Sequence, residues 1–255
     1  MKKRYSYSLV AALVMVILGT LTVAAQDRSV VVAGGQALQD RLSQTLAAAS
    51  QNQLQVANIR QTEMSNLLEV ELSSGELLYT NPAGDFLLTG DLLRTTETGV
   101  VNLTAKTRGR KVVEMIANVP ESEMIIFRPE EVKGSLTVFT DADCTFCRKL
   151  HGDIEEIMAR GIEVRYLAYP RGGSASAVFP KMISIWCAED RNRALTQAKH
   201  GQNLPERECD NPVQRHYELG NRVGITGTPA LVLDDGTVIP GYVDVDRLTS
   251  MVLPQ

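Results

Sequence analysis

Two cysteines three positions apart, Cys144 and Cys147, form the group in this chain with the clearest chemical potential. A C-x-x-C pair is typical of thiol–disulfide exchange where a strand precedes it and a helix follows it. Here the apolar run 135–140 precedes the pair and a helical pattern over 148–160 follows it. Unpaired N–H groups and the positive dipole end of a first helical turn favour a thiolate. The sequence therefore predicts that Cys144 is a nucleophile and that Cys147 can close a disulfide onto it or resolve a mixed disulfide.

Zinc binding is the main alternative use of such a pair. A structural zinc site needs four ligands, usually from two closely spaced pairs, whereas Cys187 and Cys209 stand 22 positions apart. Haem attachment needs a histidine after the second cysteine, and Arg148 stands there. A cysteine hydrolase would not need the strand-to-helix C-x-x-C. We expect no metal and no cofactor.

The first 25 residues (1–25) have the pattern of a secretory signal peptide, with a basic start, an apolar run over 9–18 and small residues over 23–25. A retained membrane anchor is the alternative, but polar residues thin the apolar run. Cleavage would remove three positive charges and no negative one, which takes the formal charge from −4 to −7. We therefore expect an exported, mildly acidic protein in an oxidising compartment, with no electrostatic reason to bind nucleic acid.

The second cysteine pair, Cys187 and Cys209, is most simply a structural disulfide. Cys187 lies in the apolar run 183–188, and buried cysteines are usually inert. A loop of this length would contribute about 3 kcal/mol in the chain-entropy description. The alternative is a second redox pair that passes electrons to the first.

Charged neighbours of the C-x-x-C pair leave its electrostatics open. His151 lies one helical turn past Cys147 and could lower a thiol pKa if charged, although a solvated helix face is the simpler interpretation. His200 and His216 are expected at the surface. Asp143 would disfavour a second negative charge beside it and so oppose the helix dipole.

The elements that must position the cysteines fall into two units. In residues 26–100, leucines recur every four positions over 36–50, which predicts a helix, and antiparallel strands follow at 68–72, 77–79 and 86–88. This unit is too small to bury a large core alone. We therefore expect it to be a dimerisation domain; a lid or tail without a partner is the alternative.

Residues 101–123 are predicted to be a linker helix. The pattern is helical over 102–118, and its only sizeable apolar stripe consists of Val112, Val113 and Ile116. A helix with so narrow an apolar face is expected to bridge two domains across solvent. Gly99 and Gly109 are expected points of flexing.

Residues 124–255 are predicted to form an α/β catalytic domain. The strand before the cysteines, the helix after them and a strand at 162–169 make a βαβ unit with a parallel strand pair. Helical stretches at 176–199 and 212–223 follow, and then strands at 230–233 and 237–239 around an Asp-Gly turn and a helix at 245–252. This order is thioredoxin-like, with a helical insertion in the middle.

Several segments together resemble the DsbC/DsbG disulfide isomerase family. They are Thr137–Asp141, Cys144–His151, Val164–Arg171, Ile185–Ala188, Gly227–Ala230 and Val238–Tyr242, with weaker likeness at Ser74-Gly75 and Asn102–Thr104. The likeness covers nearly the whole chain after residue 25. It implies a V-shaped periplasmic homodimer, joined through cystatin-like N-terminal domains, in which linker helices hold two thioredoxin-like domains around an uncharged cleft.

The resemblance also implies roles for individual residues. Cys144 would be the exposed nucleophile and Cys147 the resolving thiol, while Cys187 and Cys209 would be the family's structural disulfide. The substrates would be misoxidised exported proteins, and a membrane reductase of the DsbD type would keep the dithiol reduced.

The Thr228-Pro229 bond illustrates what only the resemblance supplies. The rarity of cis X–Pro bonds favours trans on general grounds. The family likeness instead implies a cis Pro229, in a loop that packs against the cysteines and offers backbone groups to a substrate strand.

The residues between the cysteines depart from the family. Thr145 and Phe146 stand where relatives carry Gly-Tyr or Pro-Tyr, which leaves the redox potential open. Val138 occupies the position where thioredoxin and DsbA carry a buried carboxylate, and this favours the isomerase branch. A DsbG-like reductase of single oxidised cysteines and a periplasmic holdase chaperone are the alternative functions.

Overall fold

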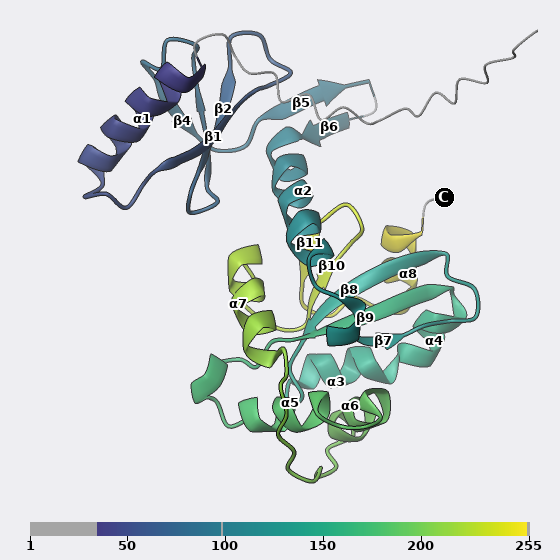
Figure 1. Ribbon diagram of the computed structural model, residues 1–255. Coiled ribbons are helices and arrows are strands. Elements are labelled where there is room, and N and C mark those ends of the chain that lie inside the picture. Colours follow the sequence, from purple (N-terminus) through teal and green to yellow (C-terminus); the bar gives the residue numbers. More distant parts are fainter. Residues whose placement is uncertain (1–34, 98, 254–255) are drawn as a thin grey trace, which may run out of the picture.

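The computed structural model describes residues 35–97 and 99–253, so the predicted signal peptide lies outside the described residues (Figure 1). Within these ranges, no helix combines the length and the apolar character that crossing a bilayer requires. The chain forms two units connected by one long helix (Figure 1).

The N-terminal unit packs one helix on a small antiparallel sheet. Helix α1 (Gly35–Ala49) precedes strands β1 (Val56–Gln61), β2 (Leu68–Leu72), β3 (Leu77–Thr80) and β4 (Leu87–Thr89), which lie in the order β1-β2-β3-β4. The leucines predicted to share one helix face are buried against the sheet, where they meet Val70 and Leu72. Strand β1 was not predicted, because its apolar and polar residues do not alternate and most of the strand is exposed or only partly buried.

A separate hairpin leads into the connecting helix. Strands β5 (Leu93–Thr96) and β6 (Gly99–Asn102) pair only with each other among the described strands, and helix α2 (Leu103–Ala117) follows directly. Asn102 caps α2 by accepting a hydrogen bond from the N–H of Ala105 at 2.8 Å. Asn102 therefore fixes the point where the chain turns from strand to helix.

The expectation that α2 crosses solvent is wrong. At its start, the fully buried Thr104 contacts the Tyr79 hydroxyl of the N-terminal sheet. Toward its end, Val112 is 6% exposed and packs with Phe139 and Leu219 of the second unit. The helix is thus anchored at both ends, because Thr104 packs against the N-terminal unit and Val112 against the second unit, although Val113 remains 38% exposed.

Gly109, predicted to be a point of flexing, is instead a point of close packing. The turn after strand β10 lies directly against α2, and a Cβ on Gly109 would come within 2.5 Å of the Asp235 carbonyl oxygen. Gly236 of the same turn has a φ of +80° and also packs against the backbone of Gly109. Two glycines facing each other let helix and turn approach more closely than any other residue would allow.

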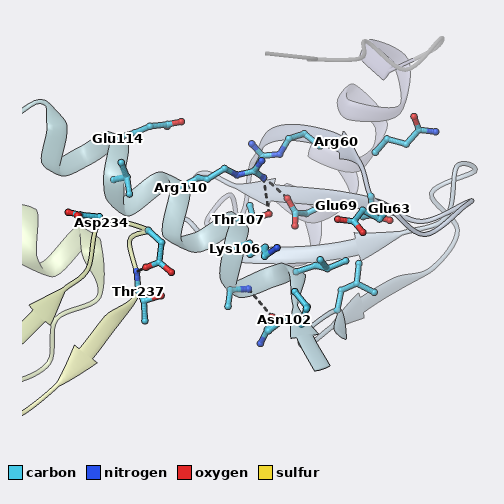
Figure 2. A pocket seen from close by; sticks show the side chains of 18 residues that line it. Arg60, Glu63, Glu69, Asn102, Lys106, Thr107, Arg110, Glu114, Asp234 and Thr237 are labelled. Atoms are coloured by element: carbon cyan, nitrogen blue, oxygen red, sulfur yellow. Dashed lines mark hydrogen bonds and ion pairs between the residues drawn. The ribbon is translucent and has the colours of Figure 1, made fainter. Parts of the chain in front are cut away.

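A cavity of about 920 Å³ opens beside this contact, between the N-terminal sheet, α2 and the β10–β11 turn (Figure 2). Its lining is rich in charges of both signs, among them Arg60, Glu69, Lys106, Arg110 and Asp234. None of the cysteines, nor Thr228 or Pro229, belongs to this lining. The cavity is therefore separate from the dithiol.

The C-terminal unit is built on a five-stranded sheet of order β11-β10-β8-β9-β7. Its strands are β7 (Ile125–Phe127), β8 (Gly134–Thr140), β9 (Ile162–Ala168), β10 (Ala230–Val232) and β11 (Val238–Pro240). Strands β8 and β9 are parallel, as the βαβ pattern predicts, and β10 and β11 form the predicted hairpin. Strand β7, which was not predicted, adds an antiparallel edge to β9.

Successive side chains of the central strands point to opposite faces of the sheet, so the core has one layer on each face. On one face, Val138 and Tyr166 pack under α3 (Thr145–Gly152), α4 (Ile154–Ala159), α5 (Phe179–Trp186), α6 (Arg191–Lys199) and α8 (Val245–Val252). On the other, Phe139 and Leu167 pack under α2 and α7 (Val213–Val223).

Two short 3-10 turns, Glu121–Glu123 and Gly173–Ala175, complete the unit. The helix predicted over 148–160 is broken at Asp153, and the stretch 176–199 is two helices.

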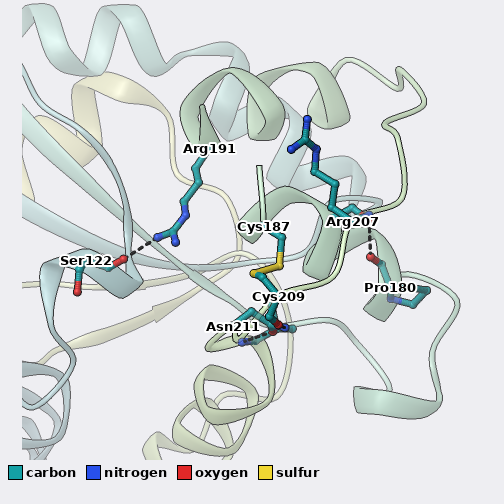
Figure 3. The surroundings of a disulfide bond; sticks show 9 residues. Ser122, Pro180, Cys187, Arg191, Arg207, Cys209 and Asn211 are labelled. Atoms are coloured by element: carbon teal, nitrogen blue, oxygen red, sulfur yellow. Dashed lines mark hydrogen bonds between the residues drawn. A yellow bond between two sulfur atoms is a disulfide. The ribbon is translucent and has the colours of Figure 1, made fainter. Parts of the chain in front are cut away.

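A disulfide within the helical insertion links the end of α5 to the segment before α7 (Figure 3). Cys187, just after α5, bonds to Cys209, and Asn211 donates a hydrogen bond to the Cys209 carbonyl at 2.9 Å. Arg191 at the start of α6 donates to the Ser122 carbonyl at 2.6 Å, as Figure 3 shows. The insertion is thus tied both to itself and to the segment before β7.

The glycine contact between α2 and the β10–β11 turn predicts a measurable effect. Replacing Gly109 by alanine forces its Cβ against the Asp235 carbonyl, so we expect the free energy of unfolding to fall by about 1–3 kcal/mol. Gly152→Ala is the control, because a Cβ there meets no atom within 4 Å and the position lies at the end of α3. Urea unfolding of both variants provides the comparison. Equal stability of Gly109→Ala and the parent would contradict the close packing.

Candidate active site

The two cysteines lie where the central strand β8 gives way to a helix. Cys144 is the N-cap of α3, with φ −75° and ψ 123°, and Cys147 is the third residue of that helix. The strand before them is buried, and Val138, the uncharged position noted in the sequence, is fully buried in it. The sequence placed this strand-to-helix junction correctly because both flanking elements have strong local patterns.

Cys144 is not the exposed thiol that the resemblance implied. It is only 3% exposed, and Cys147 is 1% exposed. The cause is the loop before β10, because its Thr228 carbonyl oxygen lies 3.2 Å from the Cys144 sulfur. The exposed side chains of the motif are instead those of Thr145 and Phe146, the latter at 58%.

The protein strongly favours the thiolate form of Cys144. Its pKa is lowered from 9.0 to about 4, chiefly because the Cys147 thiol donates a hydrogen bond to the sulfur. Burial opposes this shift, while the backbone N–H groups of Cys147 and Phe146 at the helix start support it. Cys144 is thus charged at neutral pH.

Cys147 has the opposite character. Burial raises its pKa well above the usual value for a thiol, and donation of its proton to Cys144 raises it further. Lys199, the backbone of Asp141 and the side chain of Thr140 act in the other direction. The pair therefore holds one proton, which resides on the inner sulfur.

The loop between β8 and α3 is held by the carboxylate of Asp141. This side chain is 1% exposed and accepts hydrogen bonds from the Asp143 N–H at 2.8 Å and the Arg171 N–H at 2.9 Å. The Arg171 guanidinium adds an ion pair at 3.2 Å. Asp141 thereby fixes the entry to α3 relative to the loop after β9.

Asp143, expected to oppose a thiolate at Cys144, has its charge offset by two cations. Lys181 lies 2.7 Å from its carboxylate and Arg148 lies 2.9 Å from it. Burial alone would raise the pKa of Asp143, but these cations lower it overall. The effects that favour the Cys144 thiolate therefore prevail.

The expected positions of two histidines are wrong. His151 is 2% exposed, and its ring contacts the Tyr166 hydroxyl at 3.1 Å and the Thr196 hydroxyl at 2.9 Å. Burial and the nearby Lys199 lower its pKa to about 3, so it is neutral at physiological pH and cannot lower a thiol pKa by its charge. His216 is 1% exposed rather than on the surface. Both are covered by packing between helices that no local pattern reveals.

The loop before β10 brings Thr228 and Pro229 beside Cys144. The Thr228-Pro229 peptide bond is cis, as the resemblance implied. The general rarity of cis X–Pro bonds had favoured trans. The Pro229 carbonyl accepts a hydrogen bond from Gly241 N–H at 2.8 Å, which fixes the loop to the end of β11. Four of the predicted site residues thus lie together, while Cys187 and Cys209 form their disulfide in the helical insertion.

Sequence reasoning missed Lys199. It lies at the end of α6, and its side chain is 3% exposed beside the dithiol. Leu195 and Ala198, four and one positions earlier, are also buried, so position 199 lies on the apolar face of this helix. This spacing from two apolar residues was the sequence signal that could have identified Lys199 as a buried lysine. Among residues 35–97 and 99–253, no cluster of three metal-ligating side chains occurs.

Two protein families match the chain. A thioredoxin-like domain family matches residues 120–253, and the family described as the disulfide bond isomerase protein N-terminal domain matches residues 23–105. The thiol:disulfide interchange protein DsbC of Dickeya dadantii is 37% identical over 199 residues, which are 78% of this chain and 81% of that protein. The chain belongs to the DsbC family. DsbC of Escherichia coli (strain K12) is 36% identical over 201 residues, 79% of this chain and 81% of that protein.

A solved structure is also similar to part of the chain. The disulfide interchange protein from Neisseria gonorrhoeae matches with a TM-score of 0.47 and 28% identity, over 52% of this chain and 97% of that one. Membership of the DsbC family agrees with the predicted fold, an N-terminal α+β domain followed by a thioredoxin-like domain.

The lowered pKa of Cys144 predicts the pH dependence of its alkylation. Because iodoacetamide reacts with the thiolate, the rate at Cys144 should stay nearly constant as the pH falls from 8 to 5 and decline only near about 4. An ordinary thiol would lose about tenfold in rate for each pH unit over the same range. Mass spectrometry of the reduced protein would follow the modification residue by residue.

The control for this titration is Cys147→Ala. It removes the hydrogen bond that contributes most to the lowered pKa, so the decline should begin at a higher pH. An identical profile in parent and Cys147→Ala would show that the inner thiol does not stabilise the thiolate.

Proposed function

We propose that this protein is a disulfide isomerase and reductase of exported proteins that works through Cys144 and Cys147. The observation that carries this proposal is the unequal pair: a thiolate at the start of α3 hydrogen-bonded to a buried, protonated partner. Such a pair separates the attacking sulfur from the sulfur that acts second. Its family relatives are named thiol:disulfide interchange proteins.

The first step is attack of the Cys144 thiolate on one sulfur of a non-native disulfide. A bond forms between Cys144 and that sulfur, and the other substrate sulfur leaves with the electron pair as a thiolate. A substrate thiolate can then attack the mixed disulfide and release Cys144, which rearranges the substrate without net oxidation. Alternatively Cys147 attacks Cys144, which releases a reduced substrate and an oxidised enzyme.

Thr228 and Pro229 are the proposed substrate-binding residues. The Thr228 carbonyl lies 3.2 Å from the Cys144 sulfur, so a substrate strand that reaches the thiolate must pass along this loop. The buried Thr228 hydroxyl also favours the thiolate form of Cys144. Phe146, exposed beside the thiolate, offers an apolar contact to unfolded substrate.

The cellular setting follows from the sequence and the family. The pattern of the first 25 residues supports export to the periplasm. There the substrates are misoxidised exported proteins, and a membrane reductase of the DsbD type returns the dithiol to its reduced state. The Cys187–Cys209 disulfide lies in the helical insertion, and its proposed role is structural.

The N-terminal unit is the proposed homodimer interface. Strand β4 is an edge of its sheet, and all three of its residues are exposed. The large exposed apolar residues of this unit are Met64, Phe86, Leu87, Leu88, Leu93 and Val100. An open edge strand with apolar side chains is a template for pairing with another chain. A second copy of this chain is the proposed partner.

Refolding of scrambled ribonuclease in a glutathione buffer tests the isomerase proposal. The mature protein should restore ribonuclease activity, and Cys144→Ala should not, because the attacking sulfur is gone. Cys147→Ala should accumulate mixed disulfides that non-reducing gels reveal. If the parent fails, the dithiol acts instead on single oxidised cysteines or the protein acts as a holdase; Cys147→Ala that never traps substrate would remove Cys144 from its proposed role.

Leu88→Glu tests the dimer. A charge in the exposed edge strand should oppose pairing between two copies, so the mass in sedimentation equilibrium should shift from dimer toward monomer. Val132→Glu is the matched control, since Val132 is 48% exposed but lies in the C-terminal unit. A parent protein that sediments as a monomer would refute the interface.

A further inference from the structure

Lys199 is a buried lysine beside the dithiol that the proposed mechanism does not use. Its ammonium group donates hydrogen bonds to the Thr140 hydroxyl at 2.6 Å and to the Asp141 carbonyl oxygen at 2.8 Å. Both acceptors belong to the end of β8 and the loop that leads to Cys144. The lysine itself comes from α6, in the helical insertion.

This ammonium has no carboxylate partner among the described residues. The Asp141 carboxylate is occupied by the Arg171 side chain and two backbone N–H groups, and Lys199 receives only its carbonyl. In the part of the chain that the structure describes, no ion pair includes Lys199. Burial of a cation without a counter-ion is unfavourable, and an apolar side chain of the same length would fill the space without this cost. Packing alone therefore does not account for a lysine here.

Cys147 is a neighbouring group that can carry a compensating negative charge. Among the charged groups that act on Lys199, Cys147 has the largest influence, ahead of Asp141 and Cys144. In return, Lys199 heads the groups that favour the Cys147 thiolate, and the Thr140 hydroxyl hydrogen-bonds to the same sulfur. Thr140, which is fully buried, thus lies between ammonium and thiol.

We propose that Lys199 is a positioning residue that accepts the Cys147 proton through the Thr140 hydroxyl and then stabilises the Cys147 thiolate. This inference rests on the proposed function of the dithiol and assigns a residue to its second step, the attack of Cys147 on the mixed disulfide. It concerns net reduction and release of trapped substrate, whereas the first attack by Cys144 does not require it.

The step balances in protons and electrons. The Thr140 hydroxyl gives its proton to the neutral Lys199 amine and takes the proton of Cys147. The Cys147 thiolate then attacks the Cys144 sulfur, a Cys144–Cys147 bond forms, and the bond from Cys144 to substrate breaks. The electron pair leaves with the substrate sulfur, which solvent protonates; the dithiol is oxidised and the substrate is reduced.

The need for such a group is specific to the second step. Once Cys144 is bound to substrate it no longer carries a charge, and Cys147 can no longer share its proton with it. Burial then disfavours the Cys147 thiolate. The charge of Lys199 is the largest of the effects that lower the Cys147 pKa. Burial lowers the pKa of Lys199 to about 8, so a neutral amine is present near physiological pH.

Other charged groups around the lysine set the background of its titration. Arg148 on α3 disfavours its charged form, while Asp141 favours it. His151, also on α3, and Tyr166, on β9, are both neutral at physiological pH because burial shifts the pKa of each away from neutrality. His200 follows on the same segment as Lys199 and acts on His151.

Two further charged pairs complete that background. Arg171 is paired with Asp141, and Lys181 is paired with Asp143. Lys199, whose pKa burial lowers to about 8, is therefore the group whose titration the pH profile follows in that range.

Stopped-flow reaction of the reduced protein with 5,5′-dithiobis(2-nitrobenzoate) separates the two steps. Attack by Cys144 releases one thionitrobenzoate at a rate proportional to reagent concentration. Attack by Cys147 releases the second at a rate independent of it. In Lys199→Met the second rate at pH 7 should fall about tenfold or more, since a neighbouring opposite charge is worth about one pKa unit or more. The first rate should change less than about threefold.

The pH profile of the second rate distinguishes proton acceptance from a structural effect. In the parent this rate should rise with pH and level off near pH 8, where Lys199 becomes neutral. In Lys199→Met it should go on rising to higher pH. Thr140→Val, which keeps the shape but removes the hydroxyl, should slow the second step in the same way.

Lys149→Met is the matched control, because it removes one ammonium from the exposed face of α3, where Lys149 lies over the Tyr242 ring. It should leave both rates unchanged. Unchanged second rates in both Lys199→Met and Thr140→Val at every pH would overturn this inference and leave the proposed function of Cys144 intact. A parent protein without a fast first phase would instead refute the proposed function of Cys144.

Discussion

The unequal sharing of one proton between Cys144 and Cys147 is the interaction on which the chemistry of this protein depends. A hydrogen bond from the inner thiol contributes most to the lowered pKa of the outer one, and burial of the inner sulfur keeps the proton there. Neither thiol would have its character alone. The fold must therefore hold two sulfurs together at a helix start, with one deeper than the other, and the N-cap position of Cys144 achieves this.

The two loops beside the cysteines are held in place by hydrogen bonds, because the proton distribution depends on the depth of the two sulfurs. Asp141 ties the loop before α3 to Arg171, and the Pro229 carbonyl is tied to Gly241 at the far side of the sheet. Both loops follow or precede buried central strands, β8 and β10, whose register fixes where each loop begins. Small shifts of either loop would change the depth of the thiols, and with it the proton distribution between them.

The sequence predicted the parts of the site that depend on neighbours along the chain. The C-x-x-C pair at a strand-to-helix junction, the parallel βαβ unit and the Asp-Gly hairpin all have local signatures. The burial of Cys144, His151 and His216 could not be predicted in this way, because each is covered by an element distant in sequence. Thr228, the residue that covers Cys144, lies 84 positions away from it. The packing of α2 was mispredicted for a related reason, since the turn that receives Gly109 comes much later in the chain.

The helical insertion acquires a chemical role from these contacts. Its α6 helix presents Leu195, Ala198 and Lys199 on one face, so the same face that closes the core also carries an ammonium to the end of β8. The disulfide between Cys187 and Cys209 closes the segment that contains α6, and the hydrogen bond from Arg191 to the Ser122 carbonyl fixes the start of that helix. A cation buried without a counter-ion keeps its position only if its surroundings are fixed. Helix α6, held by these two contacts, meets this requirement, and in the proposed second step the insertion acts on the dithiol as well as covering it.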